Sequence, residues 1–88
     1  MSDDDLCSVF QLPTMLGNLM GLLMAKPTVT MRMTQQITPK PKAAMFRLRK
    51  HLEGWKIEIR SRRYVGYWID DKDKARIRAY VAAKLEDA

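Results

Sequence analysis

Residues 42–69 read KAAMFRLRKHLEGWKIEIRSRRYVGYWI, and this stretch decides the fold. In its first half, Met45, Leu48 and Leu52 follow one another at i, i+3 and i+7, which places them on one face of a helix. In its second half, two isoleucines alternate with charged residues, which is the period of a half-buried strand. A loop with three arginines then leads to a second short apolar run. The stretch therefore predicts a helix, a turn and an arginine-tipped hairpin.

The residues before this stretch predict two further helices. Residues 13–25 are apolar almost all round, so this helix should be buried against several neighbours, and its two glycines permit another helix to approach closely. Residues 28–30 form a β-branched run that we expect to pair with the hairpin, and Thr30 is suited to cap a second helix, MRMTQQI. A Pro-Lys turn at residues 38–42 leads into the third helix, for which Gly54 is a natural C-terminal residue.

The two ends of the chain differ in character. Residues 1–12 hold three aspartates and then several apolar residues, and we expect a disordered tip followed by a short turn or strand on the core. Residues 70–88 begin with two aspartates suited to cap a helix, which is predicted over residues 71–86. The apolar stripe of this helix consists of Ile77, Tyr80, Val81 and Leu85. We expect the helix to pack on its own core and to contribute to a homodimer that DNA helps to form.

Together these elements predict one small domain that is mainly α with a small β-hairpin. Three helices followed by a hairpin have the order of a winged helix-turn-helix, in which the hairpin is the wing, and here a C-terminal helix is appended. The predicted parts are an acidic N-terminal tail (1–12), the winged helix-turn-helix domain (13–69) and the C-terminal helix (70–88). A chain of 88 residues is near the size at which a single core is only just sufficient.

The positive charge is concentrated in the middle of the chain. The formal net charge is +6, but residues 13–69 alone carry eleven Lys or Arg against two Glu, a net +9. The first twelve residues have a net charge of −3, and residues 70–88 are balanced. A basic excess within the predicted helix-turn-helix and wing is expected where a polyanion docks. A basic surface that only keeps the protein in solution is the alternative.

Several classes of protein are not indicated by the sequence. Cys7 is the one cysteine, which rules out an internal disulfide, and no Cys/His cluster suggests a metal site. The one histidine, His51, has no catalytic partner nearby, so we expect neither an enzyme nor a cofactor. The N-terminus is wrong for a signal peptide, and the apolar run at residues 15–25 is too short to span a bilayer. We expect a cytoplasmic, nucleoid-associated protein.

The stretch at residues 42–69 also resembles the C-terminal half of the OmpR-type DNA-binding domain. The third helix of that domain ends in R-L-R-x-x-L, and its hairpin closes with R-x-x-G-Y. Here residues 47–52 read RLRKHL and residues 63–67 read RYVGY. The run LLMAKPTVT is likewise similar to the end of that family's first helix and the short strand after it. The similarity covers about residues 13–69.

The chain also departs from that family. Twelve residues before Pro13 are too few for the family's N-terminal four-stranded sheet, and there is no receiver domain. The loop between the second and third helices is shorter than the segment with which those regulators touch polymerase. Tyr64 stands where the family commonly has glycine. We therefore expect a stand-alone winged-helix regulator of bacterial or phage origin.

The resemblance and the charge pattern imply sequence-specific binding of double-stranded DNA by a transcriptional regulator. The recognition helix, about residues 41–53, would enter the major groove, and the wing at residues 60–66 would contact the backbone or the minor groove. Arg47 and Lys50 are expected at base edges or flanking phosphates, and Phe46 on a thymine methyl or in the core. The candidate DNA-binding residues are Lys40, Lys42, Phe46, Arg47, Arg49, Lys50, Arg60, Arg62 and Arg63. Of these, Lys40, Arg49 and Arg60 are expected to contact phosphates or form local ion pairs.

Two alternatives stay open at this point. The first is a protein-interaction module, for instance a phage-encoded inhibitor or adaptor that binds an acidic surface of RNA polymerase or another host protein. The second is RNA binding, which ranks third because the aromatic residues do not form a stacking platform. Salt dependence on duplex DNA, compared with capture of a host protein, would distinguish the first alternative from DNA binding.

Overall fold

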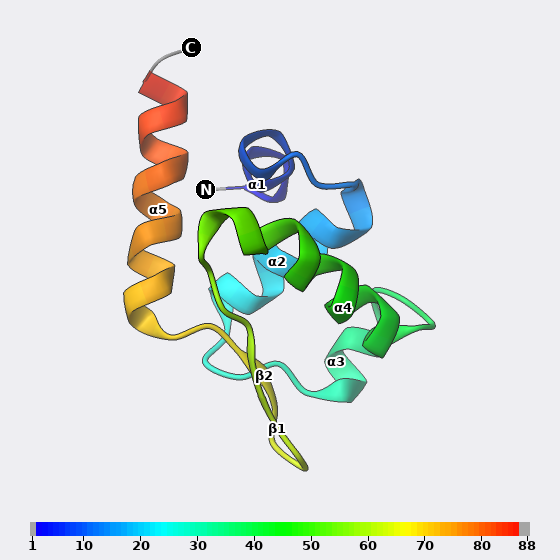
Figure 1. Cartoon of the computed structure of the whole chain (residues 1–88). Helices are drawn as coiled ribbons and strands as arrows, with labels where there is room; N and C mark the ends of the chain where they lie inside the picture. The colour runs from blue at the N-terminus through cyan, green and yellow to red at the C-terminus, as the bar shows by residue number, and fades with distance from the viewer. Residues whose placement is uncertain (1, 87–88) are drawn as a thin grey trace.

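The computed structural model describes residues 2–86 and is mainly helical, with one small antiparallel hairpin, as the sequence predicts (Figure 1). Five α-helices and one 3₁₀ helix are found in this part of the chain. In chain order the elements are α1 (Asp3–Phe10), α2 (Thr14–Ala25), α3 (Met31–Gln35), α4 (Pro41–Leu52), η1 (Glu53–Trp55), β1 (Arg60–Arg62), β2 (Gly66–Trp68) and α5 (Asp71–Glu86).

The acidic start of the chain is a helix, which corrects the expected disordered tip and short turn or strand. A capping box begins α1: the Ser2 hydroxyl accepts from the Asp5 amide at 3.2 Å, and the Asp5 carboxylate accepts from the Ser2 amide at 3.1 Å. The aspartates of the first turn also favour the positive end of the helix dipole. On the inner face, Leu6 and Phe10 are buried. The acids that suggested disorder are therefore the residues that begin the helix.

Helix α1 packs on the glycine face of α2, which confirms the close approach expected from the two glycines. A Cβ at Gly17 would collide with the Sγ of Cys7, and a Cβ at Gly21 would collide with the carboxylate of Asp3. Burial, followed by the negative charges of Asp4 and Asp3, raises the pKa of the Cys7 thiol. The thiol is therefore neutral at physiological pH and packs as a small apolar group.

No single helix in residues 2–86 is both long and apolar enough to cross a membrane. The consecutive helices α1 and α2 reach the required length and composition together, but they are bent by 116° at their junction.

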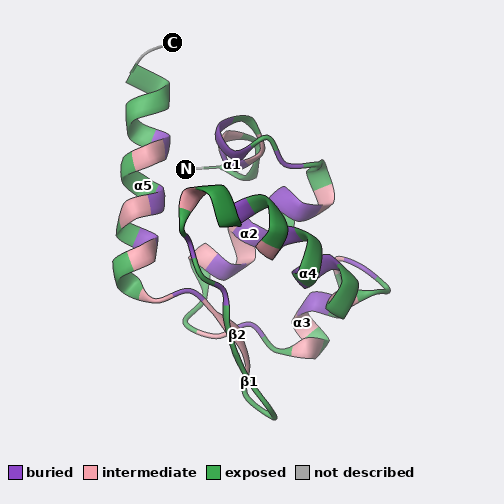
Figure 2. Ribbon diagram, viewed as in Figure 1, coloured by how far each residue is buried: buried purple, intermediate pink, exposed green. Residues whose placement is uncertain are grey.

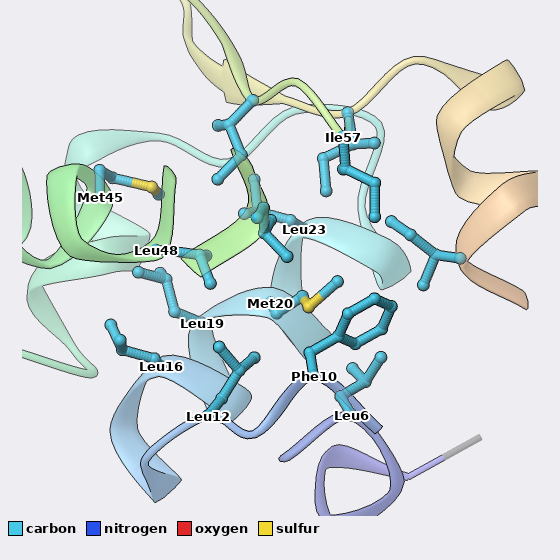
Figure 3. Packing of buried hydrophobic residues seen from close by; sticks show 14 of the residues in the cluster. Leu6, Phe10, Leu12, Leu16, Leu19, Met20, Leu23, Met45, Leu48 and Ile57 are labelled. Carbon is cyan, nitrogen blue, oxygen red and sulfur yellow. The ribbon is translucent and has the colours of Figure 1, made fainter. Parts of the chain in front are cut away.

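Helix α2 forms the centre of the core, because it is covered on several sides. Leu19, Met20 and Leu23 are fully buried. They meet residues from α1, α4 and the segment before the hairpin (Figure 3). In Figure 2 the buried residues lie on the inner sides of the surrounding helices, and the outer side of α4 is exposed. The helices that surround α2 therefore turn their apolar residues toward it and keep their polar residues at the surface.

The cap of α3 agrees with the sequence, but the turn that follows α4 does not. Thr30 caps α3 by accepting from the Met33 amide at 3.2 Å. Helix α4 ends at Leu52, within one residue of the predicted bounds 41–53, but Gly54 is not its C-terminal residue, because η1 follows directly and Lys56 takes the left-handed conformation, with φ 56°. Two hydrogen bonds from Arg76 of α5, to the carbonyls of Trp55 (3.0 Å) and Lys56 (2.8 Å), hold this turn. The contact with Arg76 cannot be predicted from the residues next to this turn, because Arg76 lies far along the chain.

The strands of the hairpin do not include the two isoleucines that the sequence places in a strand. The hairpin is also joined to the loop before α3. Its first strand begins at Arg60, because residues 57–59 run alongside the core without a partner strand and bury two isoleucines. Arg60 pairs with Trp68, and the register continues to the tip. The expected pairing of residues 28–30 is confirmed by a bridge in which Val29 and Tyr67 exchange backbone hydrogen bonds of 2.7 and 2.8 Å.

Helix α5 closes the core with its first three turns. Ile77 and Val81 are buried, as the predicted stripe requires, whereas Leu85 is 52% exposed. The Lys74 ammonium donates to the Lys26 carbonyl at the end of α2, at 3.1 Å. The aromatic cluster of Phe10, Trp55 and Tyr80 joins α1, η1 and α5, with ring centroids 4.7 to 6.4 Å apart. The last turns of α5 project beyond the rest of the molecule (Figure 1).

The contact between α1 and α2 can be tested with a double-mutant cycle. Gly17→Ala is expected to lower the free energy of unfolding by about 1–3 kcal/mol, because the new methyl overpacks against Cys7. In a Cys7→Ala background, Gly17→Ala should instead raise the free energy of unfolding by up to about 1 kcal/mol, since alanine favours the helix and only ordinary contacts remain.

Urea denaturation of the four proteins measures this coupling. Gly21→Ala is the control, because its methyl meets only the movable carboxylate of exposed Asp3, and it should be neutral or stabilising. Equal effects of Gly17→Ala in both backgrounds would show that the thiol does not limit the packing.

Candidate nucleic-acid interface

The exposed side of α4 is cationic and carries one aromatic ring. Ala44, Met45, Leu48 and Leu52 face the core, so at 100° per residue the opposite side is centred between Phe46 and Lys50. Phe46 is 61% exposed, so of its two expected positions, at the surface or in the core, it takes the one at the surface. The Lys50 ammonium lies 5.5 Å from the centre of the Phe46 ring and 3.9 Å from the Glu53 carboxylate.

The two edges of this exposed side lead to different neighbours. Lys42 faces the hairpin, where it lines a groove together with residues of α3 and the hairpin. Arg47 lies on the other edge and borders a shallow hollow, shared with Lys40 and Met15, beside the loop between α3 and α4. The side chains of α4 therefore form a strip bounded by cations on both edges.

The groove between the hairpin and the start of α3 and α4 has a volume of about 480 Å³. Its cations come from three elements, and none of its lining residues is acidic. These cations are Arg32, Lys42, Arg62 and Arg63. Met31, Val65 and Tyr67 add apolar surface. A groove lined by cations from three elements and by no acid suits an anionic ligand.

Arg32 lines this groove although it is not among the predicted DNA-binding residues. It lies in the first turn of α3, two residues after the Thr30 cap, and it faces the groove from the side opposite the hairpin. The sequence did contain a signal for it. Because residues 28–30 were expected to pair with the hairpin, the next cation along the chain had to lie close to the hairpin as well.

The candidate residues divide into those with acidic partners and those without. Arg60 forms ion pairs with Asp70 and with Glu58, the second at 3.8 Å, so much of its charge is neutralised locally. Within residues 2–86, six cations of this surface form no ion pair: Arg32, Lys40, Lys42, Arg47, Arg62 and Arg63. These six side chains supply the charge that the surface offers to a partner.

Arg49 is a structural link between α4 and the hairpin. Its guanidinium donates to the Ile59 carbonyl from Nε at 3.2 Å and from a terminal nitrogen at 2.9 Å, and to the Ser61 hydroxyl at 3.2 Å. It also lies 5.8 Å from the centre of the Tyr67 ring. Arg49 thus fixes the position of the hairpin relative to α4, and its donors are turned inward.

The exposed side of α4 also carries the one histidine of the chain. His51 is exposed near the end of α4, and no group of three or more potential metal ligands occurs among the described residues. Comparison of the chain with protein-family models, curated proteins and solved structures gave no match.

The positioning role of Arg49 gives a testable difference between two neighbouring arginines. Arg49→Ala is expected to lower the free energy of unfolding by about 1–3 kcal/mol, because it leaves the buried carbonyl of Ile59 without its donors. Amide hydrogen exchange of residues 60–68 should become faster at the same time.

Arg47→Ala is the matched control. Arg47 is exposed, so its removal should change stability by less than about 0.5 kcal/mol and leave exchange in the hairpin unaltered. If both variants behave alike, Arg49 does not hold the hairpin.

Proposed function

We propose that this chain is a winged helix-turn-helix regulator that binds double-stranded DNA in a sequence-specific manner. Helix α4 is its recognition helix, and the hairpin is its wing. The observation that carries the proposal is the set of six cations that have no acidic partner within residues 2–86, which extends from the start of α3 across α4 to the hairpin. The resemblance of residues 13–69 to OmpR-type domains supports the same function.

The dimensions of α4 suit a major groove. Its 12 residues correspond to a length of about 18 Å, and the major groove of B-DNA, about 12 Å wide, admits an α-helix. The exposed side begins with the small Ala43 and continues with Phe46 and Lys50. A close approach at Ala43 would let Lys50 and Arg47 reach base edges, and the Phe46 ring would pack on a thymine methyl.

The groove beside the hairpin suits one strand of the DNA backbone. Lys42 and Arg32 border it on one side, and the arginines of the hairpin border it on the other. A sugar-phosphate chain lying there would meet cations from both sides while α4 occupies the adjacent major groove. Arg62 and Arg63 would then reach further phosphates or the minor groove.

A regulatory role in transcription, in a bacterium or a phage, is part of the proposal. Helix α5 packs on its own core with Ile77 and Val81, so only its projecting end around Leu85 is left for a homodimer contact on DNA. An acidic surface of RNA polymerase or another host protein is the second candidate partner. The exposed rings of Phe46 and Tyr64 favour this alternative, because aromatic residues are common anchors of protein interfaces.

Salt dependence tests whether phosphates are the partner. Release of counterions by six cations, with Lys50 sharing its charge with Glu53, should make log K fall with log[salt] at a slope of roughly −4 to −7. Titration of a labelled duplex at several salt concentrations measures this slope. A flat response, or no binding at low salt, would contradict the DNA proposal and favour a protein partner.

A second prediction separates base reading from backbone contact. On a duplex selected from a random pool, Arg47→Ala should lose about 1–3 kcal/mol of binding free energy and relax the sequence preference. Lys40→Ala should weaken binding to selected and random duplexes alike, because a phosphate contact carries no sequence information. If Arg47→Ala lost the same binding free energy on both duplexes, the placement of α4 in the groove would be wrong.

A further inference from the structure

The tip of the hairpin holds an aromatic residue that neither the core nor the backbone requires. Tyr64 is 94% exposed, so its ring contributes no burial to the fold. Its backbone is in the left-handed region, with φ 67°, which is unfavourable for residues with a Cβ and is usually taken by glycine or asparagine. A large ring at such a position is a reason to look for a function outside the fold.

The neighbours of Tyr64 give the tip both apolar and cationic character. Val65 is 45% exposed directly beside it. The Arg63 guanidinium lies 5.1 Å from the centre of the Tyr64 ring, and Arg62 precedes it on the same turn. The tip therefore presents an apolar wedge flanked by two cations. This combination complements the stacked bases and flanking phosphates of DNA, whereas an acidic protein surface would complement only the cations.

The tip is held away from the body of the molecule by a rigid base. The Val65 amide donates to the Arg62 carbonyl at 3.0 Å, which closes the turn. Gly66, with φ 126°, lies so close to the Val29 carbonyl that a Cβ there would collide with it. The base of the hairpin is thus packed directly against the loop before α3, and its tip projects at the end of the molecule opposite α1 (Figure 1).

We propose that Tyr64, together with Val65, inserts as a wedge at a base step in the minor groove beside the site covered by α4, and partly unstacks that step. This inference rests on the proposed function and adds a deformation of the DNA to it. Arg62 and Arg63 hold the phosphates on either side of the opened step. Flexible pyrimidine–purine steps are the preferred target, because they are the least costly to open.

Fluorescence of 2-aminopurine tests the wedge directly, because this base brightens when it loses its stacking neighbours. A duplex is first selected with the wild-type chain, and 2-aminopurine is then placed at successive positions beside the α4 site. Wild-type protein should raise the fluorescence at one or two adjacent positions. Tyr64→Phe keeps the ring and should behave like the wild type.

Tyr64→Gly removes the wedge without harming the fold. Glycine accepts the left-handed conformation, so this variant should melt at or above the wild-type temperature. It should lose the fluorescence increase and bind roughly five- to fiftyfold more weakly, as expected for one aromatic–base contact.

The outcomes distinguish this inference from the function on which it rests. Steep, salt-dependent binding without a fluorescence change, or an undiminished change with Tyr64→Gly, overturns the wedge and leaves DNA binding intact. Absence of wild-type binding to any duplex overturns both.

Discussion

The structure depends on one constraint, which is that α2 is apolar on almost every side and must be covered on several sides. Leu19, Met20 and Leu23 are fully buried only because α1, α4 and the segment before the hairpin meet them from different directions. Each covering element turns an apolar side inward, and its polar residues are left outside. Gly17 and Gly21 let α1 approach so closely that this short helix can cover one side of α2.

This arrangement also explains why the cations gather where they do. Four buried residues of α4 fix the direction of its inner side, so its basic residues have no place except the surface. Arg49 and the bridge between Val29 and Tyr67 then hold the hairpin beside that surface. Two further cations, outside the set of six, pair with acids: Arg60 with Asp70, and Arg76 with Asp73. A hydrogen bond to Tyr80 and the nearby Asp73 also raise the pKa of Arg76 above its ordinary value.

The sequence predicts this fold well where the signals are local, and poorly where a partner lies far along the chain. The apolar period of α4, the Thr30 cap and the bounds of α5 could be read directly, because each depends on residues within a few positions. Helix α1 was misread, although the Ser2 and Asp5 spacing carried its capping box. The turn at Trp55 and Lys56 is held by Arg76, and the role of Arg49 depends on the Ile59 carbonyl, so neither could be predicted from its own neighbourhood.

The charge distribution has a consequence for how a polyanion would approach. The aspartates of α1 and the hairpin lie at opposite ends of the molecule, because α1 covers the side of α2 away from the hairpin (Figure 1). A molecule with acids at one end and free cations at the other is oriented by the field of a phosphate backbone before contact. The acidic first turn that stabilises α1 would therefore also direct the hairpin and α4 toward DNA. Under the proposed function, one short segment would link the stability of the fold to the direction of binding.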